Sequence, residues 1–491
     1  MNWKIIGRSL SSADMRKRLL AVIGMIVIFR FLAHIPIPLA EPETLKQVLE
    51  NVFSQTNGSN LLGFLNILSG GALANLSIMI IGLGPYINAS IIMQLLTKAI
   101  PKLENLNKEG EYGRKKIQQW TRILTLPLAI IQSIGTIFLV RQTAAGSSGL
   151  DSLISSASLG QWVLMVAALT GASMLLMWMG EIVTEQGVGN GISLIITVGI
   201  LAGLPAIIWN LITSVVVEGS QFSVFGKFTL PINAQALWVT LGIAAVTFIV
   251  TILVVYLNEG QRRITISYAK RVQGNRVYGG VNTTLPIRLI TAGVIPIIFA
   301  LAFLSLPEFV GRLLSQDATG KWQEFGANLA TWFATPTSQT LTSGDWTAWI
   351  YPIAYFLLVF MFTFFYTSIV FNAKEISENL QKQGGFIDGV RPGLQTEKYL
   401  LKVVNRLTLF GAIALALLAV MPIFGQAILK TDQIVIGGTS ILILVSVTLE
   451  TLRQIESRAL MITYDDYTIN IDSDHKKERK FKLFRKKKST V

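Results

Sequence analysis

Apolar segments of about 20 residues recur along the whole chain and alternate with short polar segments. A helix rises ~1.5 Å per residue, so such a segment is long enough to cross the roughly 30 Å hydrocarbon core of a bilayer. The pattern predicts ten spanning helices, near residues 19–38, 76–97, 119–140, 159–180, 191–212, 236–257, 285–306, 346–371, 406–424 and 434–452. The chain is therefore predicted to be an all-α, multi-pass membrane protein.

One apolar segment, Leu61–Leu73, is too short to cross. It contains the turn signal Ser69-Gly70-Gly71 and lies directly before the span that begins near residue 76. Because non-helical backbone at membrane depth is tolerated only where protein or water surrounds it, the pattern fits a re-entrant half-helix that lines a pathway. It fits equally an external amphipathic helix followed by an ordinary span.

Composition supports the membrane class and argues against several kinds of site. Apolar residues make up 51% of the chain and charged residues 14%, as expected where lipid is the main solvent. Cysteine is absent, which excludes disulfides and thiolate metal sites. The only two histidines, His34 and His475, argue against a histidine-built metal centre. Residues 1–18 are polar and basic, and no cleavable signal is expected.

The distribution of Lys and Arg predicts the orientation. These residues concentrate in alternate connecting segments, and the segments that include both termini carry most of them. Since basic connecting segments stay on the cytoplasmic side, both termini are predicted to be cytoplasmic. The net charge of +14 is then mainly a topology signal rather than evidence for nucleic-acid binding.

A few polar side chains lie in or beside the predicted spans. Arg30 and His34 lie in the outer part of the first span. Charge within a membrane usually faces protein or water, and here we favour an Arg30 side chain that extends outward to the headgroups. Gln94 and Asn190 are candidates for hydrogen bonds between helices.

Two long cytoplasmic segments differ from the short connections. In residues 258–286, the alternation of Ile264, Ile266 and Tyr268 with polar residues predicts a strand, followed by a turn at Gly274-Asn275 and a return strand at 276–278. The basic residues of this hairpin are Arg262, Arg263, Lys270, Arg271 and Arg276. Residues 373–403 carry Arg391 at the tip of a second loop. Two such loops on one face predict a docking platform.

Six motifs, in order along the chain, resemble the SecY family, the channel subunits of bacterial protein translocons. They are SGGAL with LGPYINASIIMQLLT at 69–97, TEQGVGNGIS at 184–193, NEGQRRITISYAKR at 258–271, TAGVIPIIFA at 291–300, GVRPGLQT at 389–396 and GGTSILI at 437–443. The resemblance extends to about residue 464 and does not cover the basic run 475–488, which we expect to attract anionic lipid or RNA phosphate.

The resemblance implies a clamshell of two inverted five-helix halves, residues 1–230 and 231–455, followed by a cytoplasmic tail at 456–491. It also implies that the short segment is a plug beneath a narrow waist. The plug residues carried over are Leu61, Phe64, Asn66, Leu68, Ser69, Gly70, Gly71 and Leu73.

The resemblance further implies a ring of apolar side chains at the waist. The ring residues carried over by motif are Leu83, Ile87, Ile192, Ile196, Ile298 and Ile443. The first two pairs have i,i+4 spacing, so each pair shares one helix face. A dry apolar constriction blocks ions by dewetting and makes no specific bond to a passing chain.

The seam between the halves would be a lateral gate built from the second, third, seventh and eighth spans, with Gln94 and Asn190 as its polar residues. Two positions depart from the family pattern. Ile290 stands where many relatives have asparagine, and Asn75 stands where relatives often have a basic residue. Both departures remove polar character near the expected gate.

The resemblance implies a protein-conducting channel in the plasma membrane. Such a channel has no active site. It would pass unfolded preproteins with signal peptides and release apolar segments into lipid. No GxxxxGK[ST] phosphate-binding loop is present, so the energy must come from a partner. The resemblance implies SecA as the ATP-driven motor, the ribosome, and the small membrane subunits SecE and SecG. Arg391 and the basic hairpin would be their cytoplasmic contacts.

Two other classes compete with this interpretation. A secondary transporter also has inverted repeats and broken helices, but it needs ionisable residues in its central helices, where this chain has few. An intramembrane enzyme needs a nucleophile–base pair or a metal-ligand set, and none stands at suitable spacing.

Overall fold

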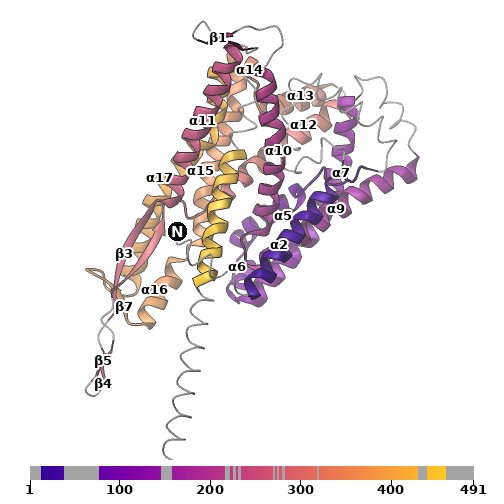
Figure 1. The fold of residues 1–491 in the computed structure, drawn as a ribbon. Coiled ribbons are helices and arrows are strands. Elements are labelled where there is room, and N and C mark those ends of the chain that lie inside the picture. The colour runs from indigo at the N-terminus through magenta and orange to yellow at the C-terminus, as the bar shows by residue number, and fades with distance from the viewer. Residues whose placement is uncertain are drawn as a thin grey trace, which may run out of the picture.

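The structure is a computed structural model of the 491-residue chain. It describes residues 13–37, 77–144, 158–215, 222–224, 228–230, 234–268, 271–273, 276–278, 282–317, 320–429 and 440–460. Long helices make up most of these residues (Figure 1). The predicted plug, Asn75, His475 and the basic tail lie outside the described residues.

The helices of the first half run up and down beside one another. They are α2 (Ala13–Leu32), α5 (Gly84–Ala99), α6 (Pro101–Lys108), α7 (Glu111–Ala144), α9 (Leu159–Gln186) and α10 (Gly191–Val215). Helix α9 begins with a capping box at Ser158 and ends at Gly187, whose φ of 68° is the left-handed conformation that glycine adopts without strain.

The second half has more helices, several of them short, and more connecting structure. Its helices are α11 (Ala234–Glu259), α12 (Ile295–Asp317), α13 (Lys321–Phe333), α14 (Ser338–Thr342), η1 (Trp346–Trp349), α15 (Ile350–Val370), α16 (Ala373–Lys382), α17 (Leu394–Leu429) and a helix at 440–460. A small hairpin, β1 (Phe222–Val224) with β2 (Phe228–Leu230), precedes α11. Among the described residues, six helical stretches are long and apolar enough to cross a membrane. The multi-pass class is confirmed, and the count of ten stays a prediction.

Two predicted spans begin later than the sequence pattern suggested. Residues 77–83 form successive turns, and α5 begins only at Gly84, with Pro85 in its first turn. Likewise, the predicted span 285–306 begins with a strand and a turn, and α12 starts at Ile295 followed by Pro296. Proline favours the first turn of a helix because it lacks the N–H that a helix interior needs. Apolar content alone does not distinguish such buried irregular backbone from helix.

The two long loops that are predicted to be cytoplasmic join in one sheet of three antiparallel strands. The strands are β6 (Asn282–Arg288), β3 (Gln261–Tyr268) and β7 (Gly385–Ile387), in that order. Ile264 pairs with Leu285, and Ile266 pairs with Ile387. The predicted strand at 264–268 is confirmed, but its main return strand is β6. The predicted return strand forms β5 (Arg276–Tyr278), which pairs with β4 (Arg271–Gln273) at the tip.

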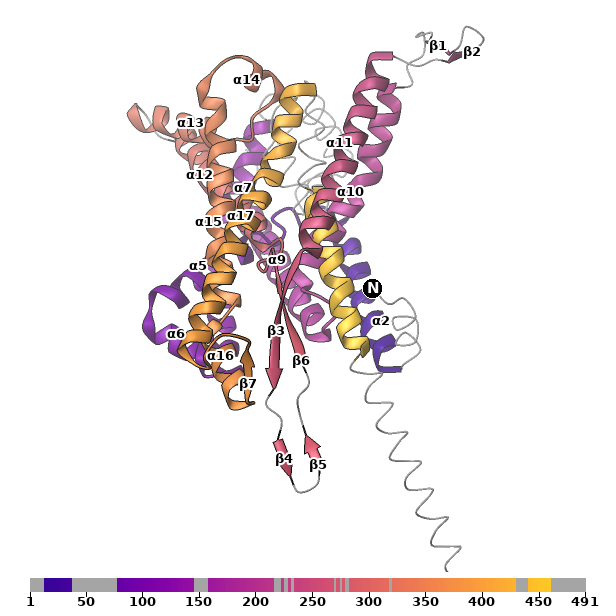
Figure 2. The same cartoon turned by 90° about the vertical axis from the view of Figure 1, so that its left-hand side faces the viewer.

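This sheet has a core of its own, apart from the membrane helices. The core consists of Ile264, Ile266, Ile287, Ala373, Leu380, Ile387, Leu400, Val403 and Val404. These residues come from both loops and from the start of α17, so the loops form one body, which we call the cytoplasmic body. Figure 2 shows β3 and β6 projecting from one end of the helices, while α13, α14 and the β1–β2 hairpin lie at the other end.

Candidate functional site

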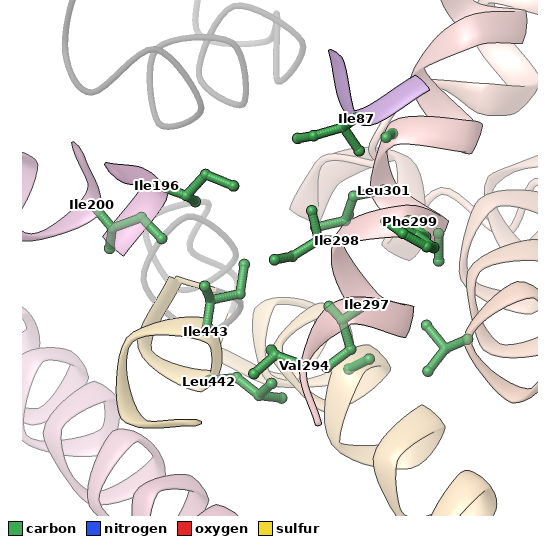
Figure 3. Packing of buried hydrophobic residues seen from close by; sticks show 14 of the residues in the cluster. Ile87, Ile196, Ile200, Val294, Ile297, Ile298, Phe299, Leu301, Leu442 and Ile443 are labelled. Atoms are coloured by element: carbon green, nitrogen blue, oxygen red, sulfur yellow. The ribbon is translucent and has the colours of Figure 1, made fainter. Parts of the chain in front are cut away.

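The predicted ring residues meet in the central core. Leu83 immediately precedes α5 and Ile87 lies in its first turn, Ile192 and Ile196 lie on α10, Ile298 lies on α12, and Ile443 lies on the helix at 440–460. Five of them are buried in one apolar cluster, and Ile192 packs against it half-buried. Figure 3 shows Ile87, Ile196, Ile298 and Ile443 directed toward one another from four separate segments. The structure thus brings together residues that are up to 360 positions apart in the sequence (83 to 443).

Local hydrogen bonds fix the backbone that carries the ring. The turn before α5 is held where the Ser173 hydroxyl of α9 donates to the Gly82 carbonyl over 3.0 Å. At the start of α10, the Asn190 side-chain oxygen accepts from the backbone N–H groups of Ile192 (3.1 Å) and Ser193 (3.4 Å). Asn190 therefore caps α10, and the hydrogen bond between helices that the sequence suggested is not what the structure shows. Its cap positions Ile192 and Ile196.

Gln94 also bonds within its own helix. Its side-chain nitrogen donates to the Ser90 hydroxyl over 3.0 Å, and its Oε1 is buried without a hydrogen-bond partner among the described residues. At the outer end of α2, His34 Nδ1 lies 2.8 Å from the Arg30 carbonyl oxygen.

Helices α5 and α7 pack directly against α12, and α12 packs against α15. These are the second, third, seventh and eighth predicted spans, so the structure places in contact the helices of the expected gate. We call the contact of α5 and α7 with α12 the gate seam. Within the described parts of these three helices, no hydrogen bond or ion pair crosses the seam.

The wall on the first-half side contains an ion pair with a buried carboxylate, which the sequence analysis missed. Glu181 of α9 is 4% exposed, and its carboxylate lies 2.7 Å from Arg122 Nη2 of α7. Gln118 donates to the same carboxylate over 3.0 Å. The sequence offered one signal for this pair. Glu181 and Arg122 each stand at the edge of an apolar segment, and a charged group in such a place is rarely buried without a partner.

The wall on the second-half side is held by aromatic rings. Phe299 of α12 meets Phe362 of α15 at a centroid distance of 6.1 Å and an interplanar angle of 81°, and it meets Tyr366 at 6.2 Å. Phe303 stands in the same edge-to-face relation to Phe362 at 6.1 Å. Such pairs stabilise beyond their buried area, so α12 and α15 form a stiff unit.

Ile290 stands just before α12 and faces a pocket lined by residues of the second half. It is buried beside α17 and lines a pocket of about 130 Å³ with polar groups that include Asn258, Arg288, Ser446 and Glu450. Burial lowers the pKa of the Arg288 guanidinium. The departure from the family pattern at this position therefore changes the interior of the second half.

The cytoplasmic body exposes the basic residues that the structure describes. Arg262 and Arg263 are exposed on β3, and Arg391 is exposed in the turn between β7 and α17. The Thr396 hydroxyl donates to the Arg391 carbonyl over 2.9 Å, which holds this turn. Lys270 and the side chains of Arg271 and Arg276 lie outside the description.

Comparisons with known proteins support one family. The family model described as SecY matches residues 77–452. The "Protein translocase subunit SecY" of Streptomyces galbus is 37% identical over 465 residues, which cover 94% of this chain and 98% of that protein. The protein of the same name from Corynebacterium glutamicum is 38% identical and covers 93% and 98%.

Solved structures show the same fold. A structure described as that of a protein conducting channel has 19% identity and a TM-score of 0.61, and covers 89% of this chain and 91% of that one. Sec61 in a canine ribosome–channel complex has 18% identity and a TM-score of 0.57, with coverage of 89% and 91%.

These findings decide between the classes that the sequence left in competition. The curated relatives are translocase subunits, which sets aside the solute transporter and the intramembrane enzyme. Among the residues that the structure describes, no group of three or more metal-ligating side chains comes together. The chain belongs to the SecY family of protein-translocation channels.

Proposed function

We propose that the six ring residues form the constriction through which this channel passes unfolded preproteins across the plasma membrane. One observation carries the proposal. Apolar side chains from four segments and both halves converge at the centre of the molecule, although those segments are far apart in sequence. Isoleucine and leucine offer passing peptide groups no hydrogen bond, so the constriction excludes water and ions while it is closed and tolerates any sequence while it is open.

The irregular backbone before α5 supports a pathway at this place. Met79, Ile80 and Ile81 are each 1% exposed, although they lie in turns rather than in a helix. Such backbone persists at membrane depth only inside protein or beside water. We propose that Leu61–Leu73, which directly precedes it, is the plug below the ring, and that the chain crosses the membrane ten times.

The gate seam is the proposed lateral exit for apolar segments and signal peptides. Each wall is held together internally, by the ion pair of Arg122 with Glu181 or by the rings around Phe362, whereas the seam between the walls has only packing. The walls can therefore separate as units at little cost in polar contacts.

The cytoplasmic body is the proposed docking surface for SecA and the ribosome. Its core ties both loops together, so Arg262, Arg263 and Arg391 are presented on a rigid support. A guanidinium there offers a planar fork of donors to a carboxylate or phosphate. Both termini are then cytoplasmic, SecE and SecG are the expected membrane partners, and the basic tail is expected to meet anionic lipid.

Conductance measurements on the purified channel in planar bilayers test the ring. Ile298→Asn and Ile443→Asn should wet the constriction and raise the resting ion current, because each puts an amide where the ring is apolar. Ile297→Asn is the matched control. Ile297 is 0% exposed and lies beside Ile298 on α12, but it is not a ring residue.

The ring assignment predicts more current for the first two variants than for the control. Equal currents in the Ile298→Asn, Ile443→Asn and Ile297→Asn variants would show that Ile298 and Ile443 only pack in the core. A parent protein that passes no preprotein, even with a motor and ATP, would contradict the channel function itself.

A further inference from the structure

The outer part of the gate seam contains a close fit between an aromatic ring and a glycine. Gly135 lies on α7 and is buried, and Phe309 lies on α12 and is half-buried. A Cβ atom built on Gly135 would overlap the ring of Phe309. The ring therefore occupies the space that any other residue at position 135 would need for its side chain. We call this space over Gly135 the notch.

Position along the helices places this contact toward the outer leaflet. Helix α7 enters from the cytoplasmic side and α12 leaves it, so residues late in both helices lie toward the outer end. The ring residue Ile298 lies three turns before Phe309 on α12 (11 residues at about 3.6 per turn). The Phe309–Gly135 contact thus closes the seam well beyond the constriction.

A buried polar group lies beside each side of the contact. On α7, the Ser133 hydroxyl lies 3.0 Å from the Thr170 hydroxyl of α9. On α12, Glu308 is 3% exposed and pairs with Arg312 at 2.9 Å, which fixes the turn that carries Phe309. The Ser133–Thr170 contact ties α7 to α9, and the Glu308–Arg312 pair stiffens α12 beside Phe309.

We propose that Phe309, seated on Gly135, is the outer catch of the lateral gate and sets how apolar a segment must be to leave the channel sideways. The proposal rests on the channel function proposed above. Lipid tails are as apolar as phenylalanine, so the catch is held by close packing rather than by hydrophobic burial. A departing segment must displace the ring from the notch. It does so only if its own transfer into lipid is more favourable than the packing of the ring that is lost.

The test uses vesicles that contain the parent or variant channel and a series of model segments of rising leucine content. Phe309→Ala empties the notch, and Gly135→Leu fills it and displaces the ring. Each single variant should release segments of lower leucine content, with the opening equilibrium raised by about fivefold, which corresponds to ~1 kcal/mol. Phe325→Ala on α13 is the size-matched control and should keep the parent threshold, because its ring is 49% exposed and meets Trp322.

The combination Gly135→Leu with Phe309→Ala sharpens the test. The new leucine can enter the space that the ring leaves, so the double variant should return toward the parent threshold. A change of threshold that arises away from this contact would not be repaired by adding the second substitution. If Gly135→Leu does not fold, the comparison of Phe309→Ala with Phe325→Ala still tests whether Phe309 sets the release threshold.

Two failures are distinguishable. A parent channel that releases no segment at all contradicts the channel function. A working parent whose Phe309→Ala variant keeps the parent threshold overturns the catch alone.

Discussion

Two of the seams that join the halves are built differently, and α10 packs on α11 across a third. Among the described residues, only packing closes the gate seam, as at Phe309 on Gly135. The second seam, which we call the clasp seam, joins α2 and residues 187–190 to the helix at 440–460. There Arg458 donates to the Gln186 carbonyl, and Arg18 donates to the same oxygen over 3.3 Å.

Apolar contacts accompany the guanidinium groups at the clasp seam. Ile455 packs against the cluster of Val22, Val183 and Val188. The Gln186 carbonyl lies at the C-terminal end of α9, where the helix dipole favours positive charge. The Arg458 bond crosses the clasp seam and would break on separation, whereas the Arg18 bond lies within the first half. The gate seam has no such crossing bond among the described residues. If the proposed lateral gate is right, we therefore expect the halves to open at the gate seam and to pivot near the clasp seam.

Locking each seam in turn gives the largest expected effect. The chain has no cysteine, so introduced pairs are the only thiols. Gly135→Cys with Phe309→Cys, bridged by oxidation or a short bis-thiol reagent, should stop nearly all translocation until a reductant is added. Gly189→Cys with Thr451→Cys should leave most translocation intact when bridged. A Cβ on Gly189 would lie 3.1 Å from Thr451 Oγ1, so the two side chains are in contact. Gly189 has a φ of 123°, which strains any side chain there, so the unbridged double variant is the reference for this pair.

The readout is protease-protected preprotein in vesicles, before and after reduction. Each single-cysteine variant, treated identically, controls for modification of one thiol. A bridged clasp seam that blocks translocation as fully as a bridged gate seam would contradict the assignment of the pivot.

Removing the clasp should lower stability without opening the channel. Arg458→Ala deletes a hydrogen bond from a charged donor, and we expect the free energy of unfolding to fall by about 1 kcal/mol, since Arg18 still reaches the Gln186 carbonyl. Thermal unfolding in detergent measures this loss. The resting ion current should stay at the parent level, because the constriction is not touched.

Arg458→Lys should retain part of the stability, since an ammonium group keeps the charge beside the helix end. Arg406→Ala, which removes an exposed arginine from α17, is the matched control. A raised resting current in Arg458→Ala would show that the two seams are coupled more closely than the contacts indicate.

Much of this arrangement could be predicted from the sequence, and the reasons differ between the parts. The hydrophobic pattern predicted the spanning segments because lipid imposes length and polarity directly. The ring came from motif resemblance, since Ile298 or Ile443 alone is indistinguishable from any apolar residue of a membrane helix. The structure brought them together with Ile87 and Ile196, which supports the prediction.

Other features depended on contacts that no local pattern reveals. The alternation at Ile264 and Ile266 predicted a strand, but its pairing with β7 joins segments about 120 residues apart (266 to 387). Asn190 was predicted to bond between helices, and it caps α10, because an asparagine just before a helix accepts from the first free N–H groups. Gly135 gave no signal, since its importance arises from a ring on another helix.

The smallest effect is expected at Ile290, where many relatives have asparagine. If this residue belonged to the gate seam, Ile290→Asn would add a polar contact there and raise the leucine content needed for release. The structure instead places it in the second half, where a Cβ on Gly411 of α17 would lie 3.7 Å from its Cγ1. Asn258 and Ser446 line the adjoining pocket of about 130 Å³, so the new amide finds hydrogen-bond partners or water there.

We therefore expect Ile290→Asn to change the free energy of unfolding by less than ~1 kcal/mol and to leave the release threshold unchanged, with Ile290→Val as the control. A release threshold that changes in Ile290→Asn, but not in Ile290→Val, would show that the gate seam includes this pocket. Phe309 would then share control of release with the start of α12.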